Sequence, residues 1–250
     1  MKSNSKFILI TGAAGFIGFH LSKKLINNNF NVIGIDNINN YYGKKIKFDR
    51  LKILSNFKKK NFVFFKTDLK DKNSLNKIFK SYKIQYVVNL AAQAGVRYSL
   101  KNPQAYIDSN IQGFFNILDL SRKFGVKHFI YASTSSVYGM NKKIPFAEKD
   151  HVNHPLQLYA STKRSNELIA HAYSNLYNLP TTGLRFFTVY GPWGRPDMAL
   201  FIFVKKILEN KSINVFNYGN HVRDFTYIDD IIDGIKKVIF KIPKKILSIK

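Results

Sequence analysis

The sequence predicts an α/β fold, in which a doubly wound parallel sheet is covered by helices on both faces, and two features carry this prediction. Short apolar runs alternate with segments whose apolar residues recur at helical spacing, which is the pattern of strands joined by crossover helices. The first run, Phe7 to Thr11, leads into a glycine-rich turn and then into a helical segment, Phe16 to Ile26. In such sheets ligands bind outside the carboxyl ends of the strands.

The remaining elements follow the same rhythm as far as Gly191. Buried strands are predicted at 31–35, 62–66, 86–91, 128–133 and 181–187, and helices at 74–82, 103–124 and 159–177. A loop rich in proline and glycine then breaks the pattern. Beyond it we expect a helix over 200–209, a strand over 213–216, a segment over 223–227 and a helix from Asp229. The break divides the chain into a first domain, 1–187, and a small second domain, 188–250.

Composition narrows the class of protein. The 250 residues are 45% hydrophobic and include no cysteine, so the chain can bury a core but has no thiolate chemistry. We find neither an apolar run of membrane-spanning length nor a signal peptide, and expect a cytoplasmic protein without membrane insertion. A net charge of +25 is found in proteins that bind nucleic acids, and also in ordinary proteins of organisms whose proteins are rich in lysine. Because the lysines are dispersed, we favour the second explanation and expect no nucleic acid.

A glycine-rich turn and an acidic residue predict the cofactor. Gly12, Gly15 and Gly18 join the first strand to the first helix, where glycines let the backbone approach a pyrophosphate at the helix N-terminus. Asp36 ends the second strand, and a carboxylate there binds the ribose hydroxyls and repels a 2′-phosphate. Together they predict a Rossmann-type domain that binds NAD rather than NADP. Asn37 and Asn40 follow the acid. They are candidates for contacts with the ribose or the phosphates, and the alternative is that they are plain loop residues.

Tyr159 and Lys163 predict a proton-transfer site. They are four residues apart in a helical segment, so the phenol and the ammonium lie on one face. A phenol with a pKa of ~10 is a poor base at neutral pH, but a nearby positive charge lowers that pKa. Beside a hydride acceptor, such a phenol can take the proton from a carbinol as it is oxidised. Thr134, at the end of the fifth predicted strand, is a candidate proton relay, with strand-end capping as the alternative.

Four ordered motifs make the chain resemble the extended short-chain dehydrogenase/reductase superfamily. They are the glycine turn, Asn89-Leu90-Ala91-Ala92, the run 131–139 around Thr134, and the Tyr159/Lys163 pair. Within the superfamily the chain is similar to nucleotide-sugar epimerases, and most of all to UDP-glucuronate 4-epimerases, from residue 6 to about 239. The resemblance implies NAD as the cofactor, a UDP-sugar as the substrate, and a homodimer formed through the helical segments 103–124 and 159–177.

The resemblance also implies roles for particular residues. Further cofactor contacts are implied for Phe16, Ile17, Asp68, Leu69, Leu90, Ala91, Ala92, Asn110 and, on the nicotinamide ribose, Lys163. Substrate contacts are implied for Arg97, Ser135, Ser136, Thr188, Arg195, Val215, Phe216 and Arg223. Arg195 would grip a sugar carboxylate, which suits the fork of a guanidinium; otherwise it is a surface arginine. Such a grip would suppress loss of CO₂ from the β-keto acid that oxidation at C4 creates.

Ser135 and Ser136 narrow the reaction. They stand where dehydratases of the superfamily carry an Asp–Glu pair and where related decarboxylases carry a Glu, so no extra acid is present to eliminate water. This favours oxidation and re-reduction at C4, with NAD recycled. A UDP-glucose 4-epimerase, or another nucleotide-sugar epimerase, is the alternative enzyme, and a non-catalytic NAD-binding remnant is an alternative of another class. Members of the family continue beyond the position of Lys250 with a second pyrophosphate-binding arginine, so we expect NAD to bind and the UDP-sugar to bind less tightly.

Overall fold

The sheet of the computed structural model, which describes residues 6–57, 61–215, 217–220 and 222–244, has six parallel strands in the order β3-β2-β1-β4-β5-β6. This is the strand order of a Rossmann fold, so the predicted fold class is confirmed. The strands are β1 (Lys6–Thr11), β2 (Asn31–Asp36), β3 (Phe62–Lys66), β4 (Lys83–Asn89), β5 (His128–Thr134) and β6 (Thr181–Phe186).

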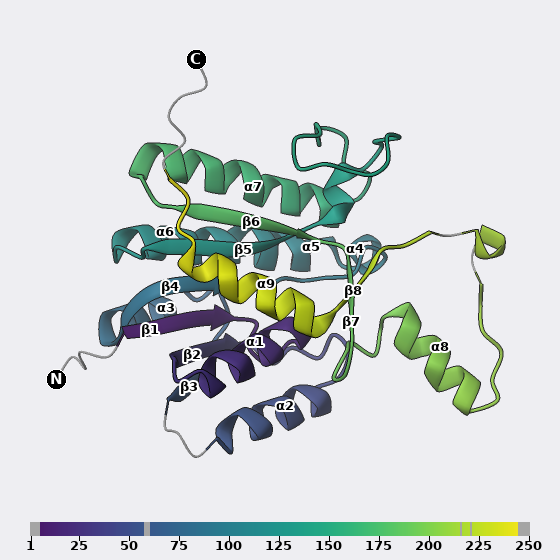
Figure 1. Ribbon diagram of the computed structural model, residues 1–250, viewed down its shortest axis with the longest axis horizontal. Coiled ribbons are helices and arrows are strands. Elements are labelled where there is room, and N and C mark those ends of the chain that lie inside the picture. Colours follow the sequence, from purple (N-terminus) through teal and green to yellow (C-terminus); the bar gives the residue numbers. More distant parts are fainter. Residues whose placement is uncertain (1–5, 58–60, 216, 221, 245–250) are drawn as a thin grey trace.

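Helices cover both faces of the sheet (Figure 1), because successive side chains of each strand point to opposite sides. Leu9 and Phe129 pack in one apolar cluster, and their neighbours Ile10 and Ile130 pack in another. The first cluster contains side chains of α3 (Lys72–Ser81), α6 (Phe114–Lys123) and α7 (Leu158–Tyr177). The second contains side chains of α1 (Phe16–Asn27), α2 (Lys45–Ser55) and α9 (Ile228–Phe240). Burial on both faces explains why the strands are almost continuously apolar.

The segment predicted as one helix over 103–124 is interrupted by a wider turn. Two short helices, α4 (Tyr98–Lys101) and α5 (Pro103–Tyr106), precede a π-helical stretch, Ile107–Gly113, which continues into α6. A π-helical turn inserts an extra residue into the helical register and is frequent at functional sites. Here it contains Asn110, one of the predicted cofactor residues.

The C-terminal part adds a second, small sheet and then returns to the first. β7 (Thr188–Tyr190) pairs with β8 (Phe225–Tyr227), while α8 (Ala199–Leu208) buries none of its residues and stands apart from the main sheet in Figure 1. The predicted strand over 213–216 is absent from 213–215, which have no regular structure. The predicted second domain includes α9, whereas Ile232 and Ile235 of that helix pack with α1 against the main sheet. In the described segments, we find no helix with both the length and the hydropathy to cross a bilayer.

Candidate active site

A cleft of about 1950 Å³ runs along the carboxyl ends of the strands, where a parallel sheet of this order is expected to bind its ligand. Most of the predicted site residues line it. They are Gly12, Gly15, Phe16, Ile17, Gly18, Asp36, Asn37, Asp68, Leu69, Leu90, Ala91, Ala92, Arg97, Thr134, Ser135, Ser136, Tyr159, Lys163, Thr188, Arg195 and Arg223. Of the others, Asn40 and Val215 are exposed outside the lining, Asn110 is buried behind it, and Phe216 lies outside the described residues.

The glycine-rich turn has the geometry that a dinucleotide pyrophosphate requires. Gly12 has a φ of +70°, and a Cβ there would lie 2.8 Å from the Ala91 nitrogen. A Cβ on Gly18 would overlap the Gly12 carbonyl group. The helix that follows begins at Phe16 with no side-chain cap and no acidic residue in its first turn. An uncapped helix N-terminus beside a backbone without side chains is suited to a bound pyrophosphate.

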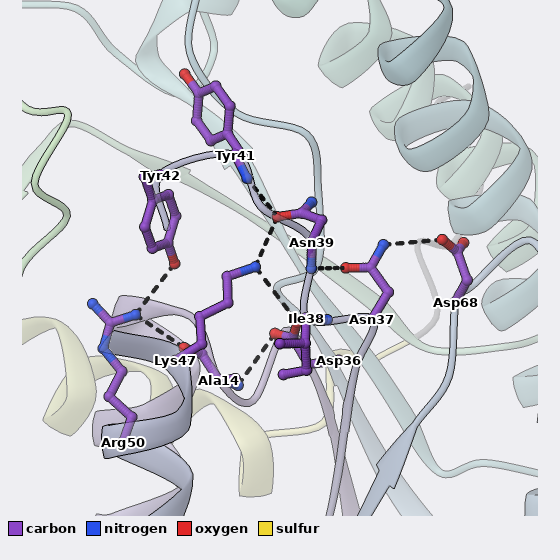
Figure 2. Close-up of polar contacts among 10 residues, drawn as sticks. All are labelled: Ala14, Asp36, Asn37, Ile38, Asn39, Tyr41, Tyr42, Lys47, Arg50 and Asp68. Atoms are coloured by element: carbon purple, nitrogen blue, oxygen red, sulfur yellow. Dashed lines mark hydrogen bonds and ion pairs between the residues drawn. The ribbon is translucent and has the colours of Figure 1, made fainter. Parts of the chain in front are cut away.

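The carboxylate of Asp36 is buried and accepts hydrogen bonds from two backbone N–H groups (Figure 2). Its Oδ2 accepts a hydrogen bond from Ala14 N at 3.2 Å, and its Oδ1 accepts one from Ile38 N at 2.8 Å. The ammonium of Lys47, which is also buried, lies 3.7 Å from Oδ1 and donates to Asn39 Oδ1 at 2.8 Å. Burial lowers the pKa of Lys47. Lys47 and Asn39 therefore line the cleft beside Asp36, and Asn40 does not line it.

The loop after β2 is tied to the loop after β3. Asn37 Nδ2 donates to Asp68 Oδ2 at 2.9 Å (Figure 2), and Leu69 follows Asp68 at the wall of the cleft. The two residues therefore hold each other in place where an adenosine would lie in this fold. Nothing in the spacing of the sequence indicated this pairing, because it joins residues on different strands.

Tyr159 and Lys163 both line the cleft from α7, and their polar groups have different partners. Burial raises the pKa of Tyr159, while a hydrogen bond with Thr134 and the positive charge of Arg195 act in the opposite direction. Lys163 Nζ instead donates to the carbonyl oxygen of Ala132, at 2.9 Å, and burial lowers its pKa to about 8. The positive charge of Arg195 thus favours the phenolate, and the prediction that Lys163 lowers the pKa of Tyr159 stays a prediction.

Thr134 has contacts that bear on both of the roles that the sequence left open. It caps the short turn that follows β5, because its Oγ1 accepts a hydrogen bond from Ser136 N at 3.2 Å. The same hydroxyl lies 3.3 Å from Ser136 Oγ, and a hydrogen bond with it acts to lower the pKa of Tyr159. The hydroxyl groups of Ser136, Thr134 and Tyr159 all belong to the lining of the cleft.

Asn110 shapes the cleft from behind. Its Oδ1 accepts a hydrogen bond from Gln93 N at 2.8 Å, and its Nδ2 donates to Gln93 O and to Thr162 Oγ1, both at 3.1 Å. The side chain therefore links the loop after β4 to α7 at Thr162, one turn of the helix beyond Tyr159. The cofactor role of Asn110 stays a prediction, and its contacts fix the backbone of that loop at Gln93.

Arg195 is held in the cleft by residues that the sequence analysis did not single out. Its Nε donates to Asp197 Oδ1 at 3.0 Å, and its guanidinium carbon lies 5.7 Å from the ring centre of Tyr41 and 5.8 Å from that of Tyr42. Only the Asp197 pairing had a signal in the sequence, namely an acid two residues after the arginine. The aromatic contacts join segments about 150 positions apart in the chain, beyond the reach of local patterns.

The other predicted substrate residues lie at the rim. Thr188 N donates to Asp224 O at 3.2 Å and so joins β7 to the segment before β8. Arg223 is exposed, with Nη1 donating to Val222 O at 3.0 Å, and Arg97 is also exposed beside the cleft. Across the described residues, no group of His, Asp and Glu side chains is arranged to hold a metal ion.

Comparison with known proteins gives consistent matches over nearly the whole chain. The family model described as "NAD dependent epimerase/dehydratase family" matches residues 8–249. Protein CapI of Staphylococcus aureus is 60% identical over 234 residues, which are 94% of this chain and 69% of that protein. A probable UDP-glucuronate 4-epimerase of Rhizobium meliloti is 49% identical over 230 residues, 92% of this chain and 67% of that protein.

A solved structure shares the fold. The UDP-glucuronic acid 4-epimerase of Bacillus cereus, crystallised in complex with UDP-glucuronic acid and NAD, superposes with a TM-score of 0.88 at 37% sequence identity. The superposition covers 97% of this chain and 75% of that one. The chain therefore corresponds to about three quarters of that neighbour.

Proposed function

The chain belongs to the NAD-dependent epimerase/dehydratase family, and from this premise we propose that it interconverts UDP-glucuronate and UDP-galacturonate by epimerisation at C4. NAD⁺, when bound, supplies the hydride acceptor and a positive charge near the phenol. The observation that carries the proposal is the position of Arg195, whose guanidinium lies within the cleft that Tyr159 also lines. A fork of this kind suits a carboxylate, which UDP-glucuronate has and neutral UDP-sugars lack.

The cleft residues suggest how the reaction proceeds. Tyr159 takes the proton from the C4 hydroxyl group as C4 loses hydride, and Thr134 shares the hydrogen bond. The 4-keto sugar then turns over in the cleft, hydride returns to the other face of C4, and Tyr159 gives the proton back. Arg195 holds the carboxylate throughout and keeps it from leaving as CO₂. Ser135 and Ser136 provide hydroxyl groups, and neither can act as the acid that elimination of water needs.

The cofactor residues follow from the cleft geometry in the same way. We assign the pyrophosphate to the turn from Gly12 to Gly18, the adenosine ribose to Asp36, and the nicotinamide side to Leu90–Ala92. Lys163 is assigned to the nicotinamide ribose, since its ammonium is held at the cleft wall by Ala132 O. We further propose that the substrate-binding part comprises residues 188–227, and that α9 belongs with the NAD-binding part.

A UDP-glucose 4-epimerase is the second candidate, and one observation favours it. Asp197 already pairs with Arg195, so the guanidinium has a carboxylate partner without any uronate. Arg195→Ala separates the two candidates. If the chain acts on uronates, the variant loses most of its kcat/KM for UDP-glucuronate and little of that for UDP-glucose, with products assigned by NMR. Equal losses on both sugars, or turnover of UDP-glucose alone by the unaltered protein, would refute the uronate proposal.

We propose that the protein forms a homodimer through α6 and α7. The apolar side chains of Phe115, Leu168, Leu176 and Tyr177 on these helices are exposed, which is unusual for a patch that faces water. Pairing the helices of two copies would cover them. Sedimentation at micromolar concentration is expected to give a dimer, and Leu168→Glu is expected to give a monomer. A monomer in the unaltered protein would refute this arrangement.

A further inference from the structure

Arg50 is a fully buried arginine that contacts both the glycine-rich turn and the loop before Arg195. It belongs to α2, and its side chain has no exposed surface. Its Nη1 donates to Ala14 O at 2.9 Å and to the Tyr42 hydroxyl at 3.2 Å (Figure 2). Its Nη2 donates to Trp193 O at 2.5 Å, with Gly194 O at 3.4 Å. A buried charge needs such partners to offset the cost of leaving water, and here all but one of them are backbone carbonyl groups.

On one side, the Arg50 guanidinium donates a hydrogen bond to the glycine-rich turn. Ala14 lies between Gly12 and Gly15, and its carbonyl group binds Arg50 while its N–H donates to Asp36 Oδ2 at 3.2 Å. One peptide segment of the glycine-rich turn thus connects Arg50 to the acid assigned to the adenosine ribose. A shift of this turn on binding a dinucleotide would move a hydrogen-bond partner of the guanidinium.

On the other side, the Arg50 guanidinium donates hydrogen bonds to the loop that leads to Arg195. Trp193 and Gly194 immediately precede Arg195, and Trp193 has a φ of +60°, which is costly for a bulky residue and persists only where the surroundings fix it. His20 of α1 adds a second hold, with its Nε2 2.9 Å from Pro192 O. The ring of Tyr42 completes the link, because it lies 5.9 Å from the Arg50 guanidinium carbon and 5.8 Å from that of Arg195.

We propose that Arg50 is a positioning residue, which couples the dinucleotide turn to the 193–195 loop and so sets Arg195 for the substrate carboxylate. The part of this inference that concerns the carboxylate rests on the proposed function. The coupling of the two loops does not, because it follows from the contacts of Arg50 alone. Arg50 does not line the cleft, so it acts through Ala14 and the loop rather than by touching substrate.

Arg50→Lys tests the proposal in turnover, because an ammonium keeps the charge but cannot hold both loops in the geometry of the fork. We expect KM for UDP-glucuronate to rise about tenfold, the size of effect typical of residues that couple two sites. The kcat of the variant and the kcat/KM for UDP-glucose should change far less. Ile78→Val, a core change on the opposite face of the sheet, is the control for lowered stability and should leave the ratio of the two kcat/KM values unaltered.

The chain provides a second readout that needs no turnover. It contains one tryptophan, which is Trp193, so tryptophan emission reports on the loop itself. Acrylamide quenching of Trp193 should change when NAD binds to the unaltered protein. In NAD-loaded Arg50→Lys, quenching should be stronger and the response to NAD smaller. Ile78→Val should behave like the unaltered protein in both respects.

The outcomes separate the inference from the proposed function. If the unaltered protein turns over no UDP-glucuronate, the proposed function fails, and the Trp193 signal alone decides the coupling. If Arg50→Lys folds and matches the unaltered protein in Trp193 quenching, in its response to NAD and in substrate preference, the inference is overturned. Should Arg50→Lys fail to fold, Tyr42→Phe removes only the hydroxyl partner of Arg50. It should shift Trp193 quenching in the same direction by a smaller amount, and no shift would overturn the inference.

Discussion

Arg195 and Asp197 form a two-pronged ion pair within the cleft, in which Nε of the arginine faces Oδ1 of the acid and Nη2 faces Oδ2. The acid therefore occupies an edge of the guanidinium that could also receive a carboxylate from a substrate. A uronate must either displace Asp197 or bind to the remaining Nη1 side. In both cases the negative charge of Asp197 opposes the approach of a second carboxylate.

Asp197→Asn is expected to strengthen the binding of UDP-glucuronate. The amide has a similar size and can still accept one hydrogen bond from Arg195, but it removes the competing charge. We expect the Kd for UDP-glucuronate to fall about three- to tenfold, because a part-buried charged hydrogen bond is worth roughly 1 kcal/mol or more. The Kd for UDP-glucose should change little. The NAD-loaded protein would be titrated with each sugar in a calorimeter.

The same substitution should lower the melting temperature of the sugar-free protein, because Arg195 loses its ionic partner. The double variant Arg195→Ala, Asp197→Asn serves as the control and should show no preference for the uronate. Weaker binding of UDP-glucuronate by Asp197→Asn would show instead that Asp197 aims Arg195, and that competition is not its main effect.

Tyr159→Phe should separate chemistry from binding. Phenylalanine keeps the ring, which lies edge-on to Tyr106 with 6.1 Å between centres, and removes only the hydroxyl group. We expect kcat to fall about 10²- to 10⁴-fold, the usual contribution of a general acid–base group, with little change in sugar affinity. Tyr177→Phe, an exposed position on the same helix, should retain full kcat. A Tyr159→Phe protein with more than about a tenth of the original kcat would exclude the phenol as the base.

The sequence predicted the sheet and the positions of the strand ends because these depend on local patterns. Strand β1 is apolar on both faces and is followed at once by Gly12, and β2 is likewise apolar and ends at Asp36. Parallel strands bring their carboxyl ends to one edge, so residues far apart in the sequence could be assigned to one cleft. The predicted fold class depended on nothing more than this.

The contacts that hold the cleft together could not be predicted in this way. Lys47 and Arg50 are buried beside the cofactor turn, but among 40 lysines and arginines nothing local distinguishes a buried cation from a solvated one. Asn39 lines the cleft and Asn40 does not, and Asn39 follows Ile38, whose φ is +53°. A β-branched residue gives no sign of that conformation in a sequence, so only the assembled fold reveals it.

His128 should make the protein sensitive to acid. Its ring is fully buried, with Nε2 2.8 Å from Thr182 Oγ1 and Nδ1 3.2 Å from Ile239 O, and burial lowers its pKa below the ordinary 6.5. The unfolded chain thus binds this proton more readily than the folded one. The contribution to stability is complete above pH 6.5 and is lost as the pH falls below that value.

His128→Gln should therefore show a smaller drop in melting temperature between about pH 7 and pH 5 than the unaltered protein. Glutamine keeps hydrogen-bonding capacity but cannot take up a proton in this range, so the two curves should converge or cross as the pH falls. His171→Gln, at an exposed position on α7, should follow the unaltered protein throughout. Parallel curves for His128→Gln and the unaltered protein would mean that His128 does not titrate on unfolding.

Substituting alanine for Gly12 should mainly lower stability, whereas substituting it for Gly15 should mainly weaken NAD binding. Gly12→Ala forces an L side chain to a φ of +70° and against Ala91 N, so we expect the free energy of unfolding to fall by about 1–3 kcal/mol.

Gly15 has a φ of −74°, which alanine adopts freely, and its methyl group would narrow the approach to the helix N-terminus. A Cβ on Gly15 would lie 3.0 Å from Gly12 O, so Gly15→Ala should lose less stability than Gly12→Ala and bind NAD at least ~10-fold more weakly, as measured by calorimetry. Gly125→Ala, with a φ of +66° far along the chain, controls for strain and should lose stability without losing NAD affinity. Unchanged NAD affinity in Gly15→Ala would place the pyrophosphate elsewhere.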